Sequence, residues 1–486
     1  MDLMNKKNNI ITIIIFQKLD GIIKVTLILL LSSFYLFSQE IPKEFYKYKL
    51  GKYFFDIGRN WDQNTTFGPT RYTHGKDISD SLIITSRLGV SLSSEKPDTL
   101  YSYSKVIYGF SHFTYKSRFH GYLYSRIVNN LNYFEGYSGI PRDITRLGFR
   151  SGETDLSGIS YENDWMIIQF GRGRQSWGAG NDIQISLSET CSPYDYGMLD
   201  LDFGKLKVRY FHGYLETDTL FFNRYITGRG VEWNNQKNIL LSISEIVIYS
   251  GENRPIDFAY FNPMSTHLEI ELNNKQNDLG TDNGNGLWQA SFDYFNRKNI
   301  RFSANYLFDE FILDLEQKKQ GKNHGAAYSL RCVFTPLSLQ SAISFYGSII
   351  SIGTNTFKHE DGRNNFIQRD NPLGWSIGSD AREFKFGINS LVLSKKVIGK
   401  VEISKIEIGE GNIINSPYEG YNDYNSVSFP SGNIEVVKNF IGEIEWWYKP
   451  NISITCNFKF NKSDTFKAFN QLELGVDMFF PIQNNL

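Results

Sequence analysis

Residues 300–308, IRFSANYLF, place an apolar side chain at every second position and a polar or small one between. The same alternation occurs in residues 206–214, LKVRYFHGY, and in residues 452–460, ISITCNFKF. Because successive side chains of a strand point to opposite faces, each stretch predicts a β-strand with one apolar and one polar face. In a soluble sandwich the apolar face packs against a second sheet, whereas in a transmembrane barrel it faces lipid and the polar face lines the lumen.

The composition favours the barrel. The 486 residues carry 51 Lys and Arg against 52 Asp and Glu, so the chain lacks the basic excess typical of nucleic-acid binding. Aromatic residues make up 15% of the chain. This enrichment is typical of the aromatic girdles at the two interfaces of a membrane barrel, although a soluble all-β protein can also be rich in tyrosine.

The N-terminus resembles an export signal. Residues 25–37, VTLILLLSSFYLF, form an uncharged apolar run between Lys24 and Ser38. A basic flank, an apolar core and a small-residue cleavage site predict a signal peptide over residues 1–38. The run is shorter than the roughly 20 residues of a membrane-spanning helix. A signal anchor lengthened by residues 10–16 is the alternative, but charged residues interrupt it.

The rest of the chain predicts one large domain. After residue 40 no apolar run approaches the length of a membrane helix, and no linker or charge block divides the chain. We expect residues 39–486 to form an all-β, closed antiparallel transmembrane barrel of about 16–18 strands with long extracellular loops. This fold places the protein in the cell outer membrane, surrounded by outer-membrane lipid.

Turn residues divide the predicted strands. Lys449-Pro450-Asn451 predicts a tight hairpin, and a second hairpin is expected between residues 384–393 and 398–408. A last strand over residues 472–480 should pair with the first and remove the exposed edge. Long polar loops facing outward are expected at residues 151–163, 273–286 and 358–374.

Residues 170–181, FGRGRQSWGAGN, form the most distinctive segment. Ala179 and Gly180 stand where a phosphate-binding loop needs Lys and then Ser or Thr, so nucleotide binding is excluded. A glycine-rich bend lets the backbone pass close to another segment. Arg172 and Arg174 are expected on the same side, where they suit carboxylates of an acidic sugar, and Trp177 could stack on a sugar ring. Alternatively, the arginines pair with lumen acids and Trp177 packs at a constriction.

No catalytic or metal site is predicted. The seven histidines form no HExxH or HxH pattern, the three cysteines form no CxxC pair, and no GxSxG motif occurs. We therefore expect no catalytic residue and no cofactor. An outer-membrane hydrolase whose Ser and His meet only in space is a further hypothesis.

Four segments occur in an order that resembles the Wzi-type capsule assembly proteins of Gram-negative outer membranes, in the variety found in Bacteroidetes-like bacteria. They are residues 170–181, residues 248–264 (IYSGENRPIDFAYFNPM), residues 308–314 (FDEFILD) and residues 371–381 (NPLGWSIGSDA). The resemblance covers roughly residues 100–480. The chain departs from the family at residues 178–180, where Gly-Ala-Gly replaces an expected Gly-Pro-Gly, and in the tail 481–486, which extends beyond the usual aromatic end.

The resemblance implies a barrel of about eighteen strands that acts as a lectin and helps assemble or retain surface polysaccharide. Its partners would be capsular or exopolysaccharide and other polysaccharide export components, and the family supplies no catalytic residue. A solute-specific outer-membrane porin is the alternative. The candidate ligand-binding residues are Arg172, Arg174, Trp177, Asn181, Trp375 and Asp380.

Overall fold

The structure is a computed structural model that describes part of the chain. The described residues are 64–68, 82–96, 102–116, 118–131, 137–278, 284–296, 298–309, 319, 325–336, 342–392, 396–420, 428–449, 451–464 and 468–484. They belong to one compact unit, residues 41–486. The predicted signal peptide lies outside them. None of the helices that they form is long and apolar enough to span a membrane.

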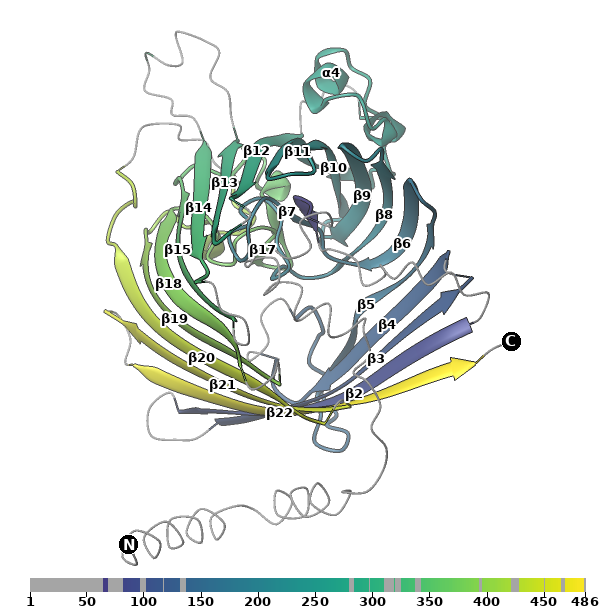
Figure 1. Ribbon diagram of the computed structural model, residues 1–486. Coiled ribbons are helices and arrows are strands. Elements are labelled where there is room, and N and C mark those ends of the chain that lie inside the picture. Colours follow the sequence, from purple (N-terminus) through teal and green to yellow (C-terminus); the bar gives the residue numbers. More distant parts are fainter. Residues whose placement is uncertain are drawn as a thin grey trace, which may run out of the picture. The chain divides into compact units, whose positions relative to one another are not determined.

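Eighteen strands form a closed antiparallel barrel in which each strand pairs with the next one along the chain (Figure 1). The last strand pairs with the first from Leu82–Asn484 to Lys96–Asn470, which closes the ring. The predicted barrel and its predicted closing pair are thus confirmed, as is the strand at residues 300–308. The strands are β2 (Leu82–Lys96), β3 (Ser102–Tyr115), β4 (Phe119–Val128), β5 (Ser151–Glu162), β6 (Met166–Gly173), β8 (Tyr194–Asp202), β9 (Leu206–Thr217), β10 (Phe222–Asn234), β11 (Ile239–Glu252), β12 (Asn285–Phe295), β13 (Ile300–Phe308), β14 (Ala326–Phe334), β15 (Ala342–Ile352), β18 (Ala381–Val392), β19 (Val397–Ile408), β20 (Glu435–Lys449), β21 (Ile452–Ser463) and β22 (Phe469–Asn484).

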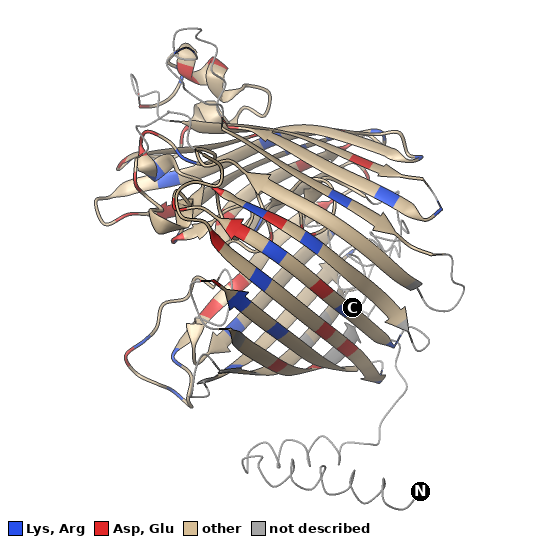
Figure 2. Cartoon of the chain, turned by 90° about the vertical axis from the view of Figure 1, so that its left-hand side faces the viewer, with Lys and Arg blue, Asp and Glu red and all other residues tan. Residues whose placement is uncertain are grey.

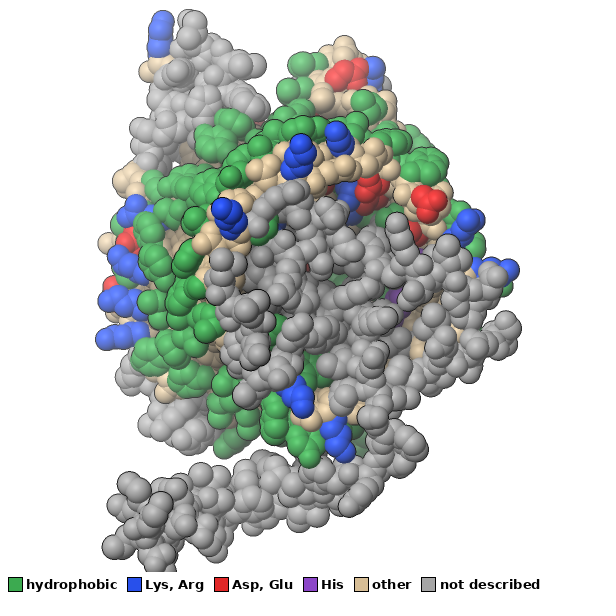
Figure 3. All heavy atoms as spheres, in the orientation of Figure 1, with side chains coloured by type: hydrophobic (Ala, Val, Ile, Leu, Met, Phe, Trp, Pro, Cys, Tyr) green, Lys and Arg blue, Asp and Glu red, His purple; other side chains and the backbone are tan. Residues whose placement is uncertain are grey.

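The two faces of the wall differ as the alternation predicts. Ser291, Asn305 and Ser329 lie opposite one another on β12, β13 and β14, and all three are buried on the lumen side. One residue further along, Tyr306 and Tyr328 are paired on the outer face and exposed. Apolar side chains of this kind cover much of the outer wall (Figure 3). The exterior therefore suits hydrocarbon, and this part of the inner wall suits polar partners.

The two ends of the barrel differ in the length of their connections. One end has short turns such as residues 235–238. The antiparallel pairing of β20 with β21 confirms the predicted hairpin between them, although Pro450 itself lies outside the described residues. The other end carries the long connections 129–150, 174–193, 253–284, 309–325, 353–380 and 409–434. Charged side chains of both signs occur along the strands and in these connections (Figure 2). We call this end the long-loop end.

One predicted loop is wrong. Residues 151–163 are read as a polar loop from the sequence, but Ser151–Glu162 is strand β5. The strand lacks an obvious amphipathic pattern because its lumen side carries Glu153 and Asp155, which pair with Arg126 of β4. The predicted loop 358–374 lies within the connection 353–380. Of the predicted loop 273–286, Asn285 and Gly286 belong to β12, and residues 279–283 lie outside the described part.

Three long connections fold back into the barrel and form an apolar core there. Connections 174–193, 353–380 and 409–434 contribute buried side chains that pack with inward-facing strand residues. The polarity of residues 358–374 predicts an outward-facing loop, but Phe366, Ile367 and Leu373 turn into this core. Small elements order these connections: β7 (Ser176–Trp177) with β1 (Phe67–Gly68), β16 (Ile367–Gln368) with β17 (Asn371–Pro372), η4 (Gly362–Asn364) and η5 (Ile413–Asn415). Figure 1 shows β7 and β17 inside the ring of strands.

Candidate functional site

The two predicted arginines lie in different surroundings. The Arg172 guanidinium donates to both carboxylate oxygens of Asp195, at 2.9 and 2.7 Å, and this pair is exposed. Arg174 is largely buried and donates to Asp155 at 2.6 Å and to the Cys191 carbonyl at 2.5 Å. Burial opposes the charge of Arg174, but the hydrogen bonds and charge of Asp155 raise its pKa above the ordinary value. Both guanidinium groups therefore bind carboxylates of the protein itself.

The glycine-rich bend after Arg174 lies against the inner wall. Asn305 of β13 accepts a hydrogen bond from the Ala179 amide at 2.7 Å and donates one to the Ala179 carbonyl at 3.0 Å. Gly180 has a φ of +81°, and a Cβ atom there would lie 2.8 Å from Ile183. The bend thus brings backbone close to another segment, as the glycines predict. Asn181 follows it and is partly buried.

Trp177 and Trp375 belong to the apolar core inside the barrel. Trp177 is fully buried, its ring centroid lies 4.9 Å from that of Phe67 and 5.2 Å from that of Phe211, and its indole N–H donates to Gln175 at 3.2 Å. Trp375 is almost completely buried in the same core. In this arrangement neither indole ring is available for stacking on a sugar.

Asp380 joins two of the long connections. Its buried carboxylate accepts hydrogen bonds from the Thr354 hydroxyl at 2.6 Å, the Ser431 amide at 2.9 Å and the Ser431 hydroxyl at 2.5 Å. The six predicted residues therefore do not meet on one surface. Four of them, namely Arg174, Trp177, Trp375 and Asp380, hold the connections inside the barrel.

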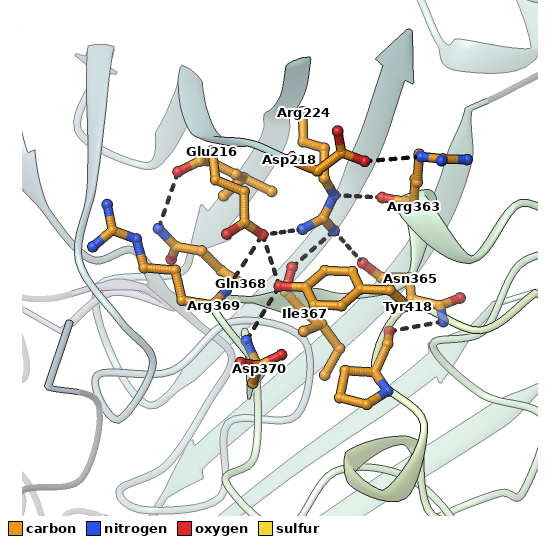
Figure 4. A network of polar contacts seen from close by, with 12 residues as sticks. Glu216, Asp218, Arg224, Arg363, Asn365, Ile367, Gln368, Arg369, Asp370 and Tyr418 are labelled. Carbon is orange, nitrogen blue, oxygen red and sulfur yellow. Dashed lines mark hydrogen bonds and ion pairs between the residues drawn. The ribbon is translucent and has the colours of Figure 1, made fainter. Parts of the chain in front are cut away.

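A different group of residues converges at the long-loop end (Figure 4). At its base lies Arg224 of β10, whose side chain is buried. It donates to Glu216 at 2.5 Å and to the carbonyls of Arg363, Asn365 and Ile367 at 2.5 to 2.8 Å. We call this group the rim network; it comprises Glu216, Asp218, Arg224, Arg363, Arg369, Asp370 and Tyr418.

Tyr418 covers the base of the rim network and is itself partly exposed. Its hydroxyl donates to Glu216 at 2.8 Å and accepts from the Asp370 amide at 3.2 Å, and the Arg224 guanidinium lies 5.1 Å from its ring centroid. Burial and the neighbouring charge of Glu216 raise the pKa of Tyr418. The phenol therefore remains a neutral hydrogen-bond donor, on a side chain that is 38% exposed.

Arg369 and Asp370 form the exposed tip of the rim network. They are the two central residues of the hairpin between β16 and β17, with φ values of +47° and +63°. Positive φ at both positions defines a type I′ turn, for which Asn-Gly is the favoured sequence. Arg369 donates to the Ser138 carbonyl at 2.9 Å and its backbone N–H donates to Glu216 at 3.3 Å. Two charged side chains thus occupy positions where the backbone prefers other residues.

A second pair extends the rim network along β10. The Arg363 guanidinium donates to Asp218 at 3.1 Å and lies 3.9 Å from the Phe222 ring centroid. Burial raises the pKa of the Asp218 carboxyl, but hydrogen bonds from the Phe222 amide and from Arg363 outweigh it and lower the pKa below its ordinary value. This arrangement presents fixed charges and hydrogen-bonding groups next to a tyrosine ring. Such a set can bind hydroxyl and carboxylate groups.

The sequence contained only part of the signal for the rim network. The polar stretch 358–374 holds Arg363, Arg369 and Asp370 and predicts a loop, yet Glu216 and Tyr418 lie far away in sequence. Only the closure of the barrel brings β9, β10 and the two connections together. Within the described residues, no cluster of His, Cys, Asp and Glu is arranged to hold a metal ion.

Comparisons with known proteins support the fold. No family model and no curated protein matches the sequence. A solved structure of Wzi, an outer-membrane protein involved in group 1 capsule assembly in Escherichia coli and a carbohydrate-binding β-barrel, is similar with a TM-score of 0.57 and 11% identity, over 81% of this chain and 84% of that one. Pseudomonas aeruginosa OpdO matches with a TM-score of 0.46 and 7% identity, over 84% and 99% of the chains. P. aeruginosa OprD matches with a TM-score of 0.45 and 7% identity, over 84% and 97%.

Proposed function

We propose that the protein is an outer-membrane, lectin-like barrel that binds capsular or exopolysaccharide and helps assemble or retain it at the cell surface. It would reach the outer membrane through the predicted signal peptide and be held there by its apolar exterior. Other polysaccharide export components would be further partners. The protein would act by binding and would not be an enzyme.

The observation that carries the proposal is the apolar core inside the barrel. Connections 174–193, 353–380 and 409–434 occupy the interior near the long-loop end and are fixed there by buried hydrogen bonds such as those of Arg224 and Asp380. A core packed against the inner side of β8 to β19 narrows the interior, which disfavours a wide aqueous channel, and it gives the exposed rim network a rigid support. The carbohydrate binding of the similar Wzi barrel agrees with this proposal.

The rim network is the proposed binding surface. Arg369 and Asp370 would contact hydroxyl or carboxylate groups of the polysaccharide, and Tyr418 would stack on a sugar ring. Arg224 and Glu216 would position them from below. Of the six residues predicted from the sequence, Arg172 and Asn181 remain candidates for direct contact. Repeated weak sites along a polymer give avidity, so modest affinity at each site suffices.

The test uses a variant that preserves the turn. Replacing Arg369-Asp370 by Asn-Gly removes both charged side chains and installs the sequence that a type I′ turn favours. We expect binding of the purified variant to a glycan array of bacterial surface polysaccharides to weaken about tenfold or more, which corresponds to about 1.4 kcal/mol. The variant should unfold at the same temperature as the wild type or higher.

The matched control lies at the opposite end of the barrel. Gln236 also has a positive φ, +57°, in the turn between β10 and β11, and Gln236→Gly should leave glycan binding unchanged. Cells that lack the protein should shed polysaccharide into the medium. Normal retention on such cells, together with unchanged glycan binding of the Arg369-Asp370 variant, would contradict the proposal. Clear single-channel conductance would favour a solute-specific porin instead.

A further inference from the structure

The outer wall of the barrel carries a polar patch where its neighbours are apolar. Arg229 of β10 and Glu245 of β11 are directly opposite one another and form an ion pair at 3.2 Å. Both share the outward face with exposed apolar residues of the same strands, such as Val231 and Ile243. The outward residue opposite Glu245 on β12 is Trp288. Charged groups in this position would face hydrocarbon, which is unfavourable in a membrane barrel.

The connection between β11 and β12 covers this patch from outside the barrel. We call residues 253–278 the outer cover; it contains η3 (Phe258–Phe261) and α4 (His267–Leu272). His267 binds Glu245 at 2.7 Å, and Arg229 donates to the Asn262 carbonyl at 3.2 Å. Figure 1 shows α4 outside the ring of strands, next to β10 and β11. The ion pair is therefore buried although it points away from the lumen.

Aromatic contacts attach the outer cover to the wall. The rings of Tyr260 and Tyr249 stack with centroids 4.4 Å apart, and those of Phe261 and His212 stack at 4.5 Å. The hydroxyl of Tyr210 donates to the Tyr260 carbonyl at 2.9 Å. The outer cover is thus packed against β9, β10 and β11 and is not a loop that merely projects from the barrel.

The outer cover exposes large apolar side chains together with several asparagines, namely Asn253, Asn262, Asn273, Asn274 and Asn277. Phe258 is 83% exposed, and Met264 and Leu272 are each 79% exposed. Ile256, Phe261 and Leu268 are also exposed. Of its charged side chains, Glu269 and Lys275 pair with each other. Exposed large apolar side chains next to polar ones are typical of segments that lie at the boundary between headgroups and acyl chains.

We propose that the outer cover is a lipid-contacting element that continues the apolar belt of the barrel. It shields Arg229 and Glu245 from hydrocarbon and places Phe258, Met264 and Leu272 in the membrane leaflet at the long-loop end. The proposal rests on the membrane location in the proposed function and is independent of polysaccharide binding. Lipid is the partner because the exposed side chains continue the surface that the strands offer to lipid on both sides of the patch.

The experiment places a polarity-sensitive fluorophore on single cysteines in phosphatidylcholine vesicles. Phe258→Cys and Met264→Cys are made in a Cys332→Ser, Cys456→Ser background, where Cys191 is buried. Two further labelled positions serve as controls. Native Cys332, exposed on the outer face of β14 and labelled in Cys456→Ser protein, reports whether the barrel has inserted. Ser416→Cys, an exposed position just after η5, reports on water.

Labels at positions 258 and 264 should lose most of their emission when the lipids carry a nitroxide on the acyl chain, as the Cys332 label should, and should resist iodide in the buffer. The Ser416 label should show the reverse. If the labels at 258 and 264 respond as the Ser416 label does while Cys332 is quenched by the lipid nitroxide, the outer cover does not contact lipid and the inference is wrong. If the Cys332 label is not quenched by the nitroxide, the membrane location itself is wrong, and this inference with it.

Discussion

At the scale of single residues, burial decides how much a carboxylate contributes to the stability of the fold. Asp380 is completely buried and accepts three hydrogen bonds from the connections at the long-loop end. Asp195 accepts two from Arg172 but is more than half exposed. Removing a buried acceptor leaves its hydrogen-bond donors unsatisfied. When an exposed ion pair is removed, water replaces the lost partner at little cost in stability.

We therefore expect Asp380→Ala to lower the free energy of unfolding by about 2–4 kcal/mol, because the buried Ser431 donors and the partly buried Thr354 hydroxyl lose their acceptor. The matched change Asp195→Ala should lower it by less than about 1 kcal/mol. Urea unfolding of both variants in the same detergent provides the measurement. Equal losses would show that the three bonds of Asp380 do not stabilise the connections.

The pair of Asp218 and Arg363 predicts a pH dependence. Because the pKa of Asp218 is lowered in the folded protein, its charge stabilises the fold at pH values above the ordinary aspartate pKa. That contribution should disappear as the pH falls through the folded pKa. The thermal midpoints of wild type and Asp218→Asn should therefore differ at neutral pH and converge in acid. A constant difference across the whole range would contradict this assignment.

At the scale of elements, the sequence predicted strands better than connections. The alternation of residues 300–308 and the hairpin between β20 and β21 reflect local rules, and both are confirmed. Strand β5 was missed because its lumen face carries acids whose partners, Arg126 of β4 and Arg174, are brought to them only by the fold. The rim network was missed because Glu216 and Tyr418 lie far apart in sequence. The burial of Trp177 depends on connections that return into the barrel, and no local pattern signals such a return.

The glycine-rich bend allows the contribution of packing to be separated from that of backbone conformation. Gly180 and Gly204 have nearly equal φ values, +81° and +82°. A Cβ atom at Gly180 would lie 2.8 Å from Ile183 and 2.9 Å from Ser303, whereas at Gly204 the nearest atom is 3.6 Å away, on Gln236. We expect Gly204→Ala to cost about 1 kcal/mol through backbone strain alone.

Gly180→Ala should cost at least about 1 kcal/mol more than Gly204→Ala, because the wall and the bend must also move apart. Limited proteolysis should then cut the connection 174–193 faster in the Gly180 variant, and unfolding in urea should give the difference in stability. Indistinguishable behaviour of the two variants would mean that the bend does not lie tightly against β13.

At the scale of the whole molecule, the barrel separates two tasks. Its exterior provides a surface for lipid, and the outer cover shields the ion pair of Arg229 and Glu245 on β10 and β11. Part of its interior is used for packing, because the long connections form an apolar core against β8 to β19. The number of strands leaves room for a channel, so the absence or presence of a pore depends on how firmly those connections are held.

Arg224 of β10 holds the connection 353–380 inside the barrel most directly, because it donates to three backbone carbonyls of that connection. In planar bilayers the wild-type barrel should show no resolved conductance steps. Arg224→Met keeps the apolar stem but removes every donor, so the connection loses its attachment and steps should appear. Arg172→Met, at an exposed pair near the same end, should remain silent. Conductance steps of equal size in all three proteins would mean that ions and water cross the barrel past these connections. The alternative of a solute-specific porin would then explain the interior better than the proposed polysaccharide-binding barrel.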